Sequence, residues 1–242
     1  MKRREFIAKC GAGLTEMIAA GLPMVGGAVP VRSAIGARQI ETTDGEESDR
    51  PYKRELPWIH SVSGLNYFLV NWPASTENYQ RVRFYFGGNA ISEQGWFFCT
   101  TSGSGASYLS TVECYKNWST QWVFGAKNYD KTMPNMNLYA GQVLDFINDD
   151  GAFSAYVGNE KLDEAECGKS FEGISAILCR RRYYSYEYSV HCRVGFFQYW
   201  CSKAEMFSDC RPVIMKDGQV GYYDLIREQF YPNAGTGVIA TP

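Results

Sequence analysis

Metal-ligating residues are scarce in this chain of 242 residues. It has only two histidines, His60 and His191, and none of its eight cysteines forms a Cys-x-x-Cys pair. Structural zinc sites use four closely spaced Cys or His ligands. The sequence therefore argues against a zinc-stabilised domain.

The chain also lacks the apolar pattern of a long helix. Nowhere do apolar residues recur with a 3.6-residue period over several turns, whereas short apolar or alternating runs separated by Gly, Ser and Asn clusters are frequent. We expect an all-β fold with little helix.

A strong charge of either sign is missing as well. The net charge is −2, and because the first 37 residues carry five basic and two acidic side chains, the remainder has a net charge of −5. A mildly acidic body argues against nucleic acid or an anionic membrane as the main partner.

The N-terminus resembles a twin-arginine export signal. Arg3 and Arg4 are followed by Phe6 and an aliphatic residue, and a weakly apolar region over residues 11–31 precedes small residues at 34, 36 and 37. Lys2 and Glu16 depart from the usual pattern. We expect residues 1–37 to be a signal peptide, so that the mature form has no transmembrane span; the alternative is a membrane anchor, which Glu16 and Pro23 weaken.

Residues 38–57 have almost nothing to bury, which predicts a flexible polar linker. The folded domain is then expected over residues 58–242. With the export signal, this organisation predicts a periplasmic, cell-surface or extracellular protein.

Strand signals dominate the expected domain. Residues 81–86 alternate, with Val82, Phe84 and Phe86 on one side. Asp-Gly pairs at 150–151 and 217–218, each between apolar runs, predict two hairpins. Further strands are expected at residues 66–70, 95–99, 110–115, 121–124, 142–147, 152–157, 173–179, 188–200, 212–215 and 220–223.

Seven cysteines remain after the expected leader. That number is typical of a protein with disulfides in an oxidising compartment, and Cys201 with Cys210 is the first candidate pair. Seven is odd, so at least one thiol is unpaired within the chain. Buried cysteines that act as small apolar residues are the alternative.

The end of the chain carries a family resemblance. A proline, a Gly-containing turn, a Gly-Tyr-Tyr-Asp strand and a Phe-Tyr-Pro-Asn segment before Gly-Thr-Gly resemble the end of concanavalin A-like (LamG-like) lectin/glucanase domains. The residues that match are Pro212, Gly221, Tyr223, Asp224, Phe230, Tyr231, Asn233, Gly235 and Gly237. The resemblance implies a jelly-roll β-sandwich in which antiparallel strands form two facing sheets, and it covers about the last 30 residues.

Glucanases with this sandwich carry paired carboxylates on one strand in a Glu-x-Asp-x-x-Glu pattern, because alternate residues share a face. The sequence has no such strand. Asp145, Asp149 and Asp150 straddle a hairpin turn, and the acids at 160–166 lie in what we expect to be a polar connection. We therefore predict a protein that is not an enzyme, with a glycoside hydrolase as the less favoured alternative.

Carbohydrate recognition is the leading prediction, since aromatic rings near Asp, Asn and Gln groups suit sugar faces and hydroxyls. Candidate contact residues are Trp118, Tyr129, Asp130, Tyr184 and Tyr186, although aromatics that merely cover the sandwich edge would look the same. No cofactor is expected beyond calcium, for which Asp149 and Asp150 are weak candidates that a plain turn also explains. A structural or adhesive module with a surface protein partner is the competing class.

Overall fold

β-Strands are the regular secondary structure of the described part of the chain, as expected. In this computed structural model the described residues are 49–63, 65–88, 94–100, 113–117, 121–126, 129–133, 138, 140–169, 172–182 and 185–242. They form twenty strands and no helix, and all belong to the compact unit Asp44–Pro242. Within these residues no helix is long and apolar enough to cross a membrane.

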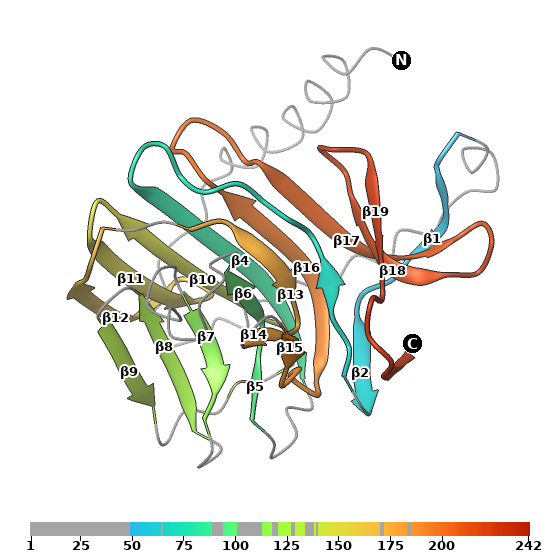
Figure 1. Cartoon of the computed structure of the whole chain (residues 1–242), viewed down its shortest axis with the longest axis horizontal. Helices are drawn as coiled ribbons and strands as arrows, with labels where there is room; N and C mark the ends of the chain where they lie inside the picture. The colour runs from blue at the N-terminus through green and yellow to red at the C-terminus, as the bar shows by residue number, and fades with distance from the viewer. Residues whose placement is uncertain are drawn as a thin grey trace, which may run out of the picture. The chain divides into compact units, whose positions relative to one another are not determined.

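The larger layer is an antiparallel sheet of eleven strands (Figure 1). Eight of them follow one another in the order β12 (Glu160–Glu166), β11 (Ala152–Val157), β10 (Gln142–Asp149), β4 (Tyr79–Gly88), β16 (Arg193–Trp200), β17 (Ser208–Met215), β18 (Val220–Asp224) and β19 (Gln229–Pro232). The other three pair at one end: β1 (Tyr52–Glu55) with β17, β2 (Ile59–Ser63) with β16, and β20 (Val238–Ala240) with β2.

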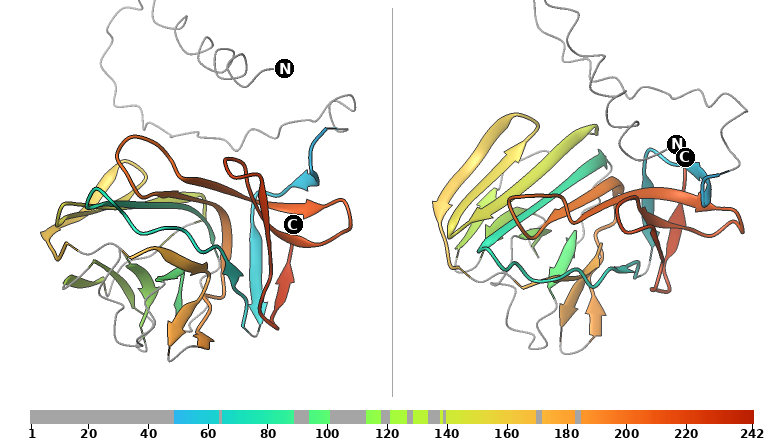
Figure 2. Two further views of the ribbon diagram at one scale, coloured as in Figure 1. Left: turned by 45° about the horizontal axis from the view of Figure 1, so that its top comes forward. Right: turned by 90° about the horizontal axis from the view of Figure 1, so that it is seen from above.

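The second layer consists of three smaller sheets on one side of the large sheet (Figure 2). A four-stranded sheet contains β5 (Gly95–Trp96), β7 (Glu113–Lys116), β8 (Trp122–Ala126) and β9 (Tyr129–Met133). Beside it are a sheet of β3 (Phe68–Leu69), β13 (Ile174–Ile177) and β6 (Phe98–Thr100), and a pair of β14 (Arg180–Arg182) and β15 (Ser185–Glu187). The described part of the chain is thus an all-β sandwich.

Aromatic side chains fill the space between the layers. The alternation along β4 places Val82, Phe84 and Phe86 on the core side, each with 0% exposure. The ring centroid of Phe84 lies 4.5 Å from that of Phe97 and 5.0 Å from that of Phe197. The period-two pattern therefore sorts β4 into a core side and a side that faces away from the second layer.

Both Asp-Gly hairpins are confirmed. Asp150 and Gly151 have φ angles of 50° and 95°, which a tight turn between β10 and β11 requires. Gly218, with a φ of 90°, closes the turn between β17 and β18 by donating its backbone N–H to the Met215 carbonyl at 3.0 Å.

The final segment is fixed to the segment that precedes β3. The Asn233 side chain accepts backbone N–H groups of Tyr67 (3.3 Å) and Gly235 (3.1 Å) and donates to the Asn66 side chain (3.0 Å). A Cβ added at Gly235 would lie 2.1 Å from the Leu65 carbonyl oxygen. The Asn-x-Gly element of the C-terminal motif is therefore structural, because it allows two backbone segments to pack closely.

Asp224 of the same motif is a buried hydrogen-bond acceptor. Its carboxylate accepts the Ser208 hydroxyl and the backbone N–H groups of Asp209 (3.2 Å), Ile226 (3.0 Å) and Arg227 (3.2 Å). Its exposure is 0%. The side chain thus joins the start of β17 to the turn that follows β18.

Two expectations about chain organisation were wrong. Tyr52–Glu55, expected in the linker, forms β1, because Tyr52 buries its ring against Tyr223 at a centroid distance of 5.4 Å. Glu160–Glu166, expected to be a connection, forms β12 at the edge of the large sheet. Edge strands often carry charges that discourage pairing with other chains, so a polar sequence does not exclude a strand there.

The expected disulfide between Cys201 and Cys210 is not formed, and both carry free thiols. Cys210 lies opposite Phe197 in the β16–β17 ladder, four residues before Cys201. At about 3.3 Å per residue this offset is about 13 Å, well beyond the Cα separation of about 7 Å that a disulfide tolerates. Cys210 is fully buried and packs in the core as a small apolar residue.

The buried phenols predict that stability falls at alkaline pH. Burial raises the pKa of Tyr231 to about 12 and also raises the pKa of Tyr199 and Tyr222. In the unfolded chain these groups ionise near pH 10, so above that pH the native state holds more protons than the unfolded state. Denaturant unfolding should give a constant free energy from about pH 7 to 8 and a decreasing one between about pH 10 and 12.

Buried thiols should also lower the free energy of unfolding at alkaline pH, because burial raises the pKa of Cys114 and Cys210. Their contribution should begin near pH 8.5, where unfolded cysteines ionise. A free energy of unfolding that stays unchanged up to about pH 11 would contradict this assignment of buried groups.

Candidate ligand-binding face

The side of the large sheet that faces away from the second layer carries aromatic, arginine and carboxylate side chains. Alternation along β4 points Arg81, Arg83 and Tyr85 away from the core, and all three are half-buried. Arg193 shares this side, because a Cβ added at Gly87 would lie 2.7 Å from the Arg193 Cβ. We call the following side chains the outer face: Tyr79, Arg81, Arg83, Tyr85, Val143, Asp145, Ile147, Asp149, Arg193, Phe196, Gln198, Trp200, Asp209 and Arg211.

Asp145 lies at the centre of the outer face with two arginines against it. Arg81 donates to both carboxylate oxygens, Nε to Oδ1 at 2.8 Å and Nη2 to Oδ2. Arg83 donates to Oδ2 alone, from Nε at 3.1 Å and from Nη2 at 2.8 Å. These hydrogen bonds fix both guanidinium groups, and the bond to Asp145 raises the pKa of Arg81.

Three guanidinium groups of the outer face stack on aromatic rings. Arg81 lies 4.7 Å from the ring centroid of Trp200, and Arg211 lies 5.2 Å from that of Phe196. Arg193 lies 4.5 Å from the ring of Trp58, in the segment between β1 and β2. Stacking of this kind holds both partners in place and leaves aromatic surface beside charged groups.

A second polar group lies across β16 and β17. Asp209 accepts Arg211 Nη2 at 2.9 Å and Gln198 Nε2 at 3.1 Å. In the ladder Gln198 is directly opposite Asp209 on one side and Arg83 on the other. The hydrogen-bonding groups of Asp145 and Asp209 therefore belong to one continuous strip across four strands.

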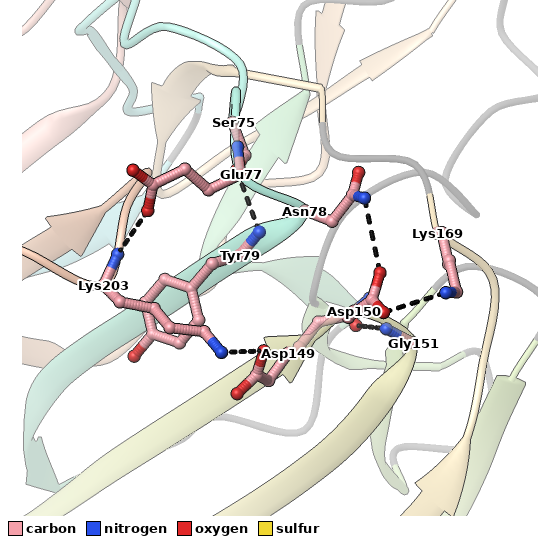
Figure 3. Close-up of polar contacts among 10 residues, drawn as sticks. Ser75, Glu77, Asn78, Tyr79, Asp149, Asp150, Gly151, Lys169 and Lys203 are labelled. Atoms are coloured by element: carbon pink, nitrogen blue, oxygen red, sulfur yellow. Dashed lines mark hydrogen bonds and ion pairs between the residues drawn. The ribbon is translucent and has the colours of Figure 1, made fainter.

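The strip ends in an ion-pair cluster (Figure 3). Lys203 Nζ lies 2.7 Å from Asp149 Oδ1, and the Lys203 backbone N–H donates to Glu77 at 3.1 Å. Its ammonium is 5.9 Å from the ring of Tyr79. Because the Asp149 carboxylate hydrogen-bonds to Lys203, the pKa of Lys203 is raised.

Asp150, the other carboxylate of the expected calcium pair, does not join the cluster of Lys203 and Asp149. Asp150 accepts Lys169 Nζ at 2.9 Å and Asn78 Nδ2 at 3.3 Å, which lowers its pKa. Asp149 and Asp150 therefore form ion pairs with two different lysines. The described residues contain no group of three or more potential metal ligands.

The sequence-predicted contact residues that the structure describes do not lie on the outer face. Tyr186 is in β15, where it stacks on Tyr67 at a centroid distance of 4.5 Å. Tyr129 and Asp130, expected in a loop, belong to β9 of the second layer, and their side chains are not described. Trp118 and Tyr184 lie outside the described residues.

Sequence reasoning missed the outer face, although part of its signal was present. The alternation that assigned Phe84 and Phe86 to the core also assigns Arg81, Arg83 and Tyr85 to the opposite side. What the sequence does not show is that Trp200 and Asp145 come from strands on either side of β4.

Comparisons with known proteins support the fold of this chain. No family model matches this chain, and no curated protein matches it. A solved structure from Bacteroides ovatus, described as a "putative carbohydrate binding protein", is similar with a TM-score of 0.50 and 12% sequence identity. The match covers 78% of this chain and 60% of that one, so this chain spans less than two thirds of the solved protein. At this identity the likeness shows the fold alone.

Proposed function

We propose that this chain is an exported, non-catalytic binding protein whose outer face recognises carbohydrate. The observation that carries the proposal is the strip of half-buried rings and fixed polar groups across β10, β4, β16 and β17. Sugars present apolar C–H faces between hydroxyl groups, so a receptor needs aromatic surface beside hydrogen-bonding groups. Trp200 supplies a ring, and Arg83, which the Asp145 carboxylate holds in place, supplies hydrogen-bond donors on the neighbouring strand.

Preorganisation supports the same function. Arg81 is held by Asp145 on one side and by Trp200 on the other, so little side-chain entropy remains to be lost on binding. Glycan affinity depends on many weak contacts, for which rigid groups are an advantage.

A jelly roll of the concanavalin A-like type is part of the proposal. The C-terminal motif, the two-layer architecture and the likeness to a solved protein described as carbohydrate-binding support it. Export rests on the N-terminal sequence, with residues 1–37 as signal peptide and a linker that ends before β1, and it places the protein in the periplasm, on the cell surface or outside the cell. A calcium ion is not needed for the proposed site.

The competing function is a structural or adhesive module whose outer face contacts a protein. A glycoside hydrolase is less favoured, because the two carboxylates at the centre of the face, Asp145 and Asp209, are each occupied by arginine. Release of reducing sugar from a β-glucan by the purified chain would establish the hydrolase instead.

Trp200→Ala tests the site. On an array of plant, host and microbial glycans, the purified full chain should bind, and the variant should lose about 10-fold or more in affinity, because it removes one aromatic surface and the ring on which Arg81 stacks. Tyr186→Ala, at a residue that the sequence alone favoured, is the matched control and should bind normally. If only Tyr186→Ala lost glycan binding, the binding site would be at β14 and β15 instead. If the unmodified chain bound no glycan on the array, the protein-contact module would be favoured.

A further inference from the structure

We infer that the glycan bound by the outer face is acidic, bearing carboxylate or sulfate groups along a polymer. This inference rests on the proposed function and goes further by naming the ligand class. Two guanidinium groups of the outer face carry positive charge that no carboxylate of the described residues fully balances: those of Arg83 and Arg193.

The first surplus charge is at Arg83. The Asp145 carboxylate is already engaged at both oxygens by Arg81, so Arg83 shares one oxygen as a second cation. The Arg83 side chain is 37% exposed, against 24% for Arg81 and 6% for Asp145. Two guanidinium groups on one carboxylate leave one positive charge, and Arg83 is the group that faces solvent.

The second surplus charge is at Arg193. Its guanidinium lies over Trp58, and among the described residues it has no carboxylate partner. The nearby His60 cannot balance this charge, because an imidazole is either neutral or cationic; burial and then the Arg193 charge lower its pKa and so favour the neutral form. Arg193 is therefore a cation fixed by an aromatic ring rather than by an acid.

The spacing of the two arginines fits a polymer. In the ladders Arg83 is opposite Gln198 and Arg193 is opposite Gly88, which places them about five residues, or about 16 Å, apart along β4. Tyr85 and Phe196 lie in the interval, with ring centroids 6.1 Å apart. A polysaccharide whose acid groups recur along the chain could contact both arginines while its sugar rings cover the aromatic pair.

The surplus of positive charge is local to the outer face. The chain beyond residue 37 has a net charge of −5, so positive charge on the outer face is not a general property of the surface. Guanidinium groups bind carboxylate and sulfate through paired hydrogen bonds, and stacking on rings orients them for this contact. Both acid types share this chemistry.

The test compares polymers that differ in charge. Binding of the full chain is measured to polygalacturonate, to the same polymer with its acids methyl-esterified, to dextran sulfate, to unsulfated dextran and to polyglutamate. We expect an acidic polysaccharide to bind at least about 10-fold more tightly than its neutral counterpart, with affinity falling as salt rises. The carboxylate and sulfate arms identify which acid is preferred.

The outcomes are distinguishable. Equal binding of acidic and neutral polysaccharides would overturn the inference and leave the proposed function standing. Binding of polyglutamate as tight as that of any polysaccharide would mean simple attraction of polyanions and would overturn both. If the chain bound none of the polymers and no glycan on the array, both the inference and the proposed function would be overturned.

Variants locate the contact. Arg83→Gln should weaken binding of the preferred acidic polymer about 10-fold and reduce its salt dependence, while Asp145 stays paired with Arg81 and the melting temperature stays unchanged. Arg193→Gln should act similarly. Arg227→Gln is the matched control, because it removes a guanidinium stacked on a ring, Phe207, in the turn between β18 and β19. If both outer-face variants fold and bind like the control, the inference is wrong.

Discussion

Replacement of Phe84 by alanine should lower the free energy of unfolding by about 3–5 kcal/mol. Phe84 lies where both layers meet, with ring contacts to Phe97 at 4.5 Å, Phe197 at 5.0 Å and Phe146 at 6.1 Å. Three surrounding rings belong to different segments and cannot all move into the space, so a cavity remains. Denaturant unfolding of the purified chain measures the loss.

The matched control lies on the other side of the same sheet. Phe196 is half-buried on the outer face, so Phe196→Ala removes a ring of equal size without opening a core cavity and should cost clearly less. Equal losses for the two variants would mean that the space between the layers is not the stabilising core.

Asp224→Ala should lower the free energy of unfolding by about 2–4 kcal/mol. The substitution removes the acceptor for four donors, of which the Ser208 hydroxyl and the Asp209 N–H lie at the start of β17. The N–H groups of Ile226 and Arg227 are in the turn that follows β18. Each buried donor left without a partner costs about 1–3 kcal/mol, and two of them account for the expected loss.

Asp224→Asn separates hydrogen bonding from packing, because the amide keeps one acceptor oxygen and should lose less stability than alanine. Asp217→Ala is the surface control: Asp217 hydrogen-bonds to Gln219 in the exposed hairpin turn, and its loss should change stability by less than about 1 kcal/mol. An Asp224→Ala variant as stable as this control would show that the buried carboxylate does not hold the motif together.

Local patterns predicted much of the fold. The alternation at 81–86 identified β4 and its core side, and two Asp-Gly pairs identified the β10–β11 and β17–β18 hairpins. These signals succeed because strand periodicity and turn conformation depend on neighbouring residues. Predictions from local sequence failed where long-range contacts determine the secondary structure. β1 is a strand because Tyr52 packs on Tyr223, and β12 is a strand because it pairs with the edge of β11.

The candidate site was less predictable than the fold for the same reason. Aromatic residues near polar ones in expected loops drew attention to Tyr129 and Tyr186, which belong to strands of the second layer. The outer face is assembled from residues that are distant in sequence: Arg81 meets Asp145 from β10 and Trp200 from β16. Only the strand order reveals that neighbourhood, and the strand order is not encoded in any single segment.

The pairing of β2 with β20 has a consequence for biosynthesis. The Asn66 side chain donates to the Val238 carbonyl at 3.2 Å, a contact between residues 172 positions apart. During translation this edge of β2 stays unpaired until the segment that contains β20 has left the ribosome. Folding of this sandwich should therefore finish only after β20 has been synthesised, and until then the nascent chain exposes an unpaired strand edge.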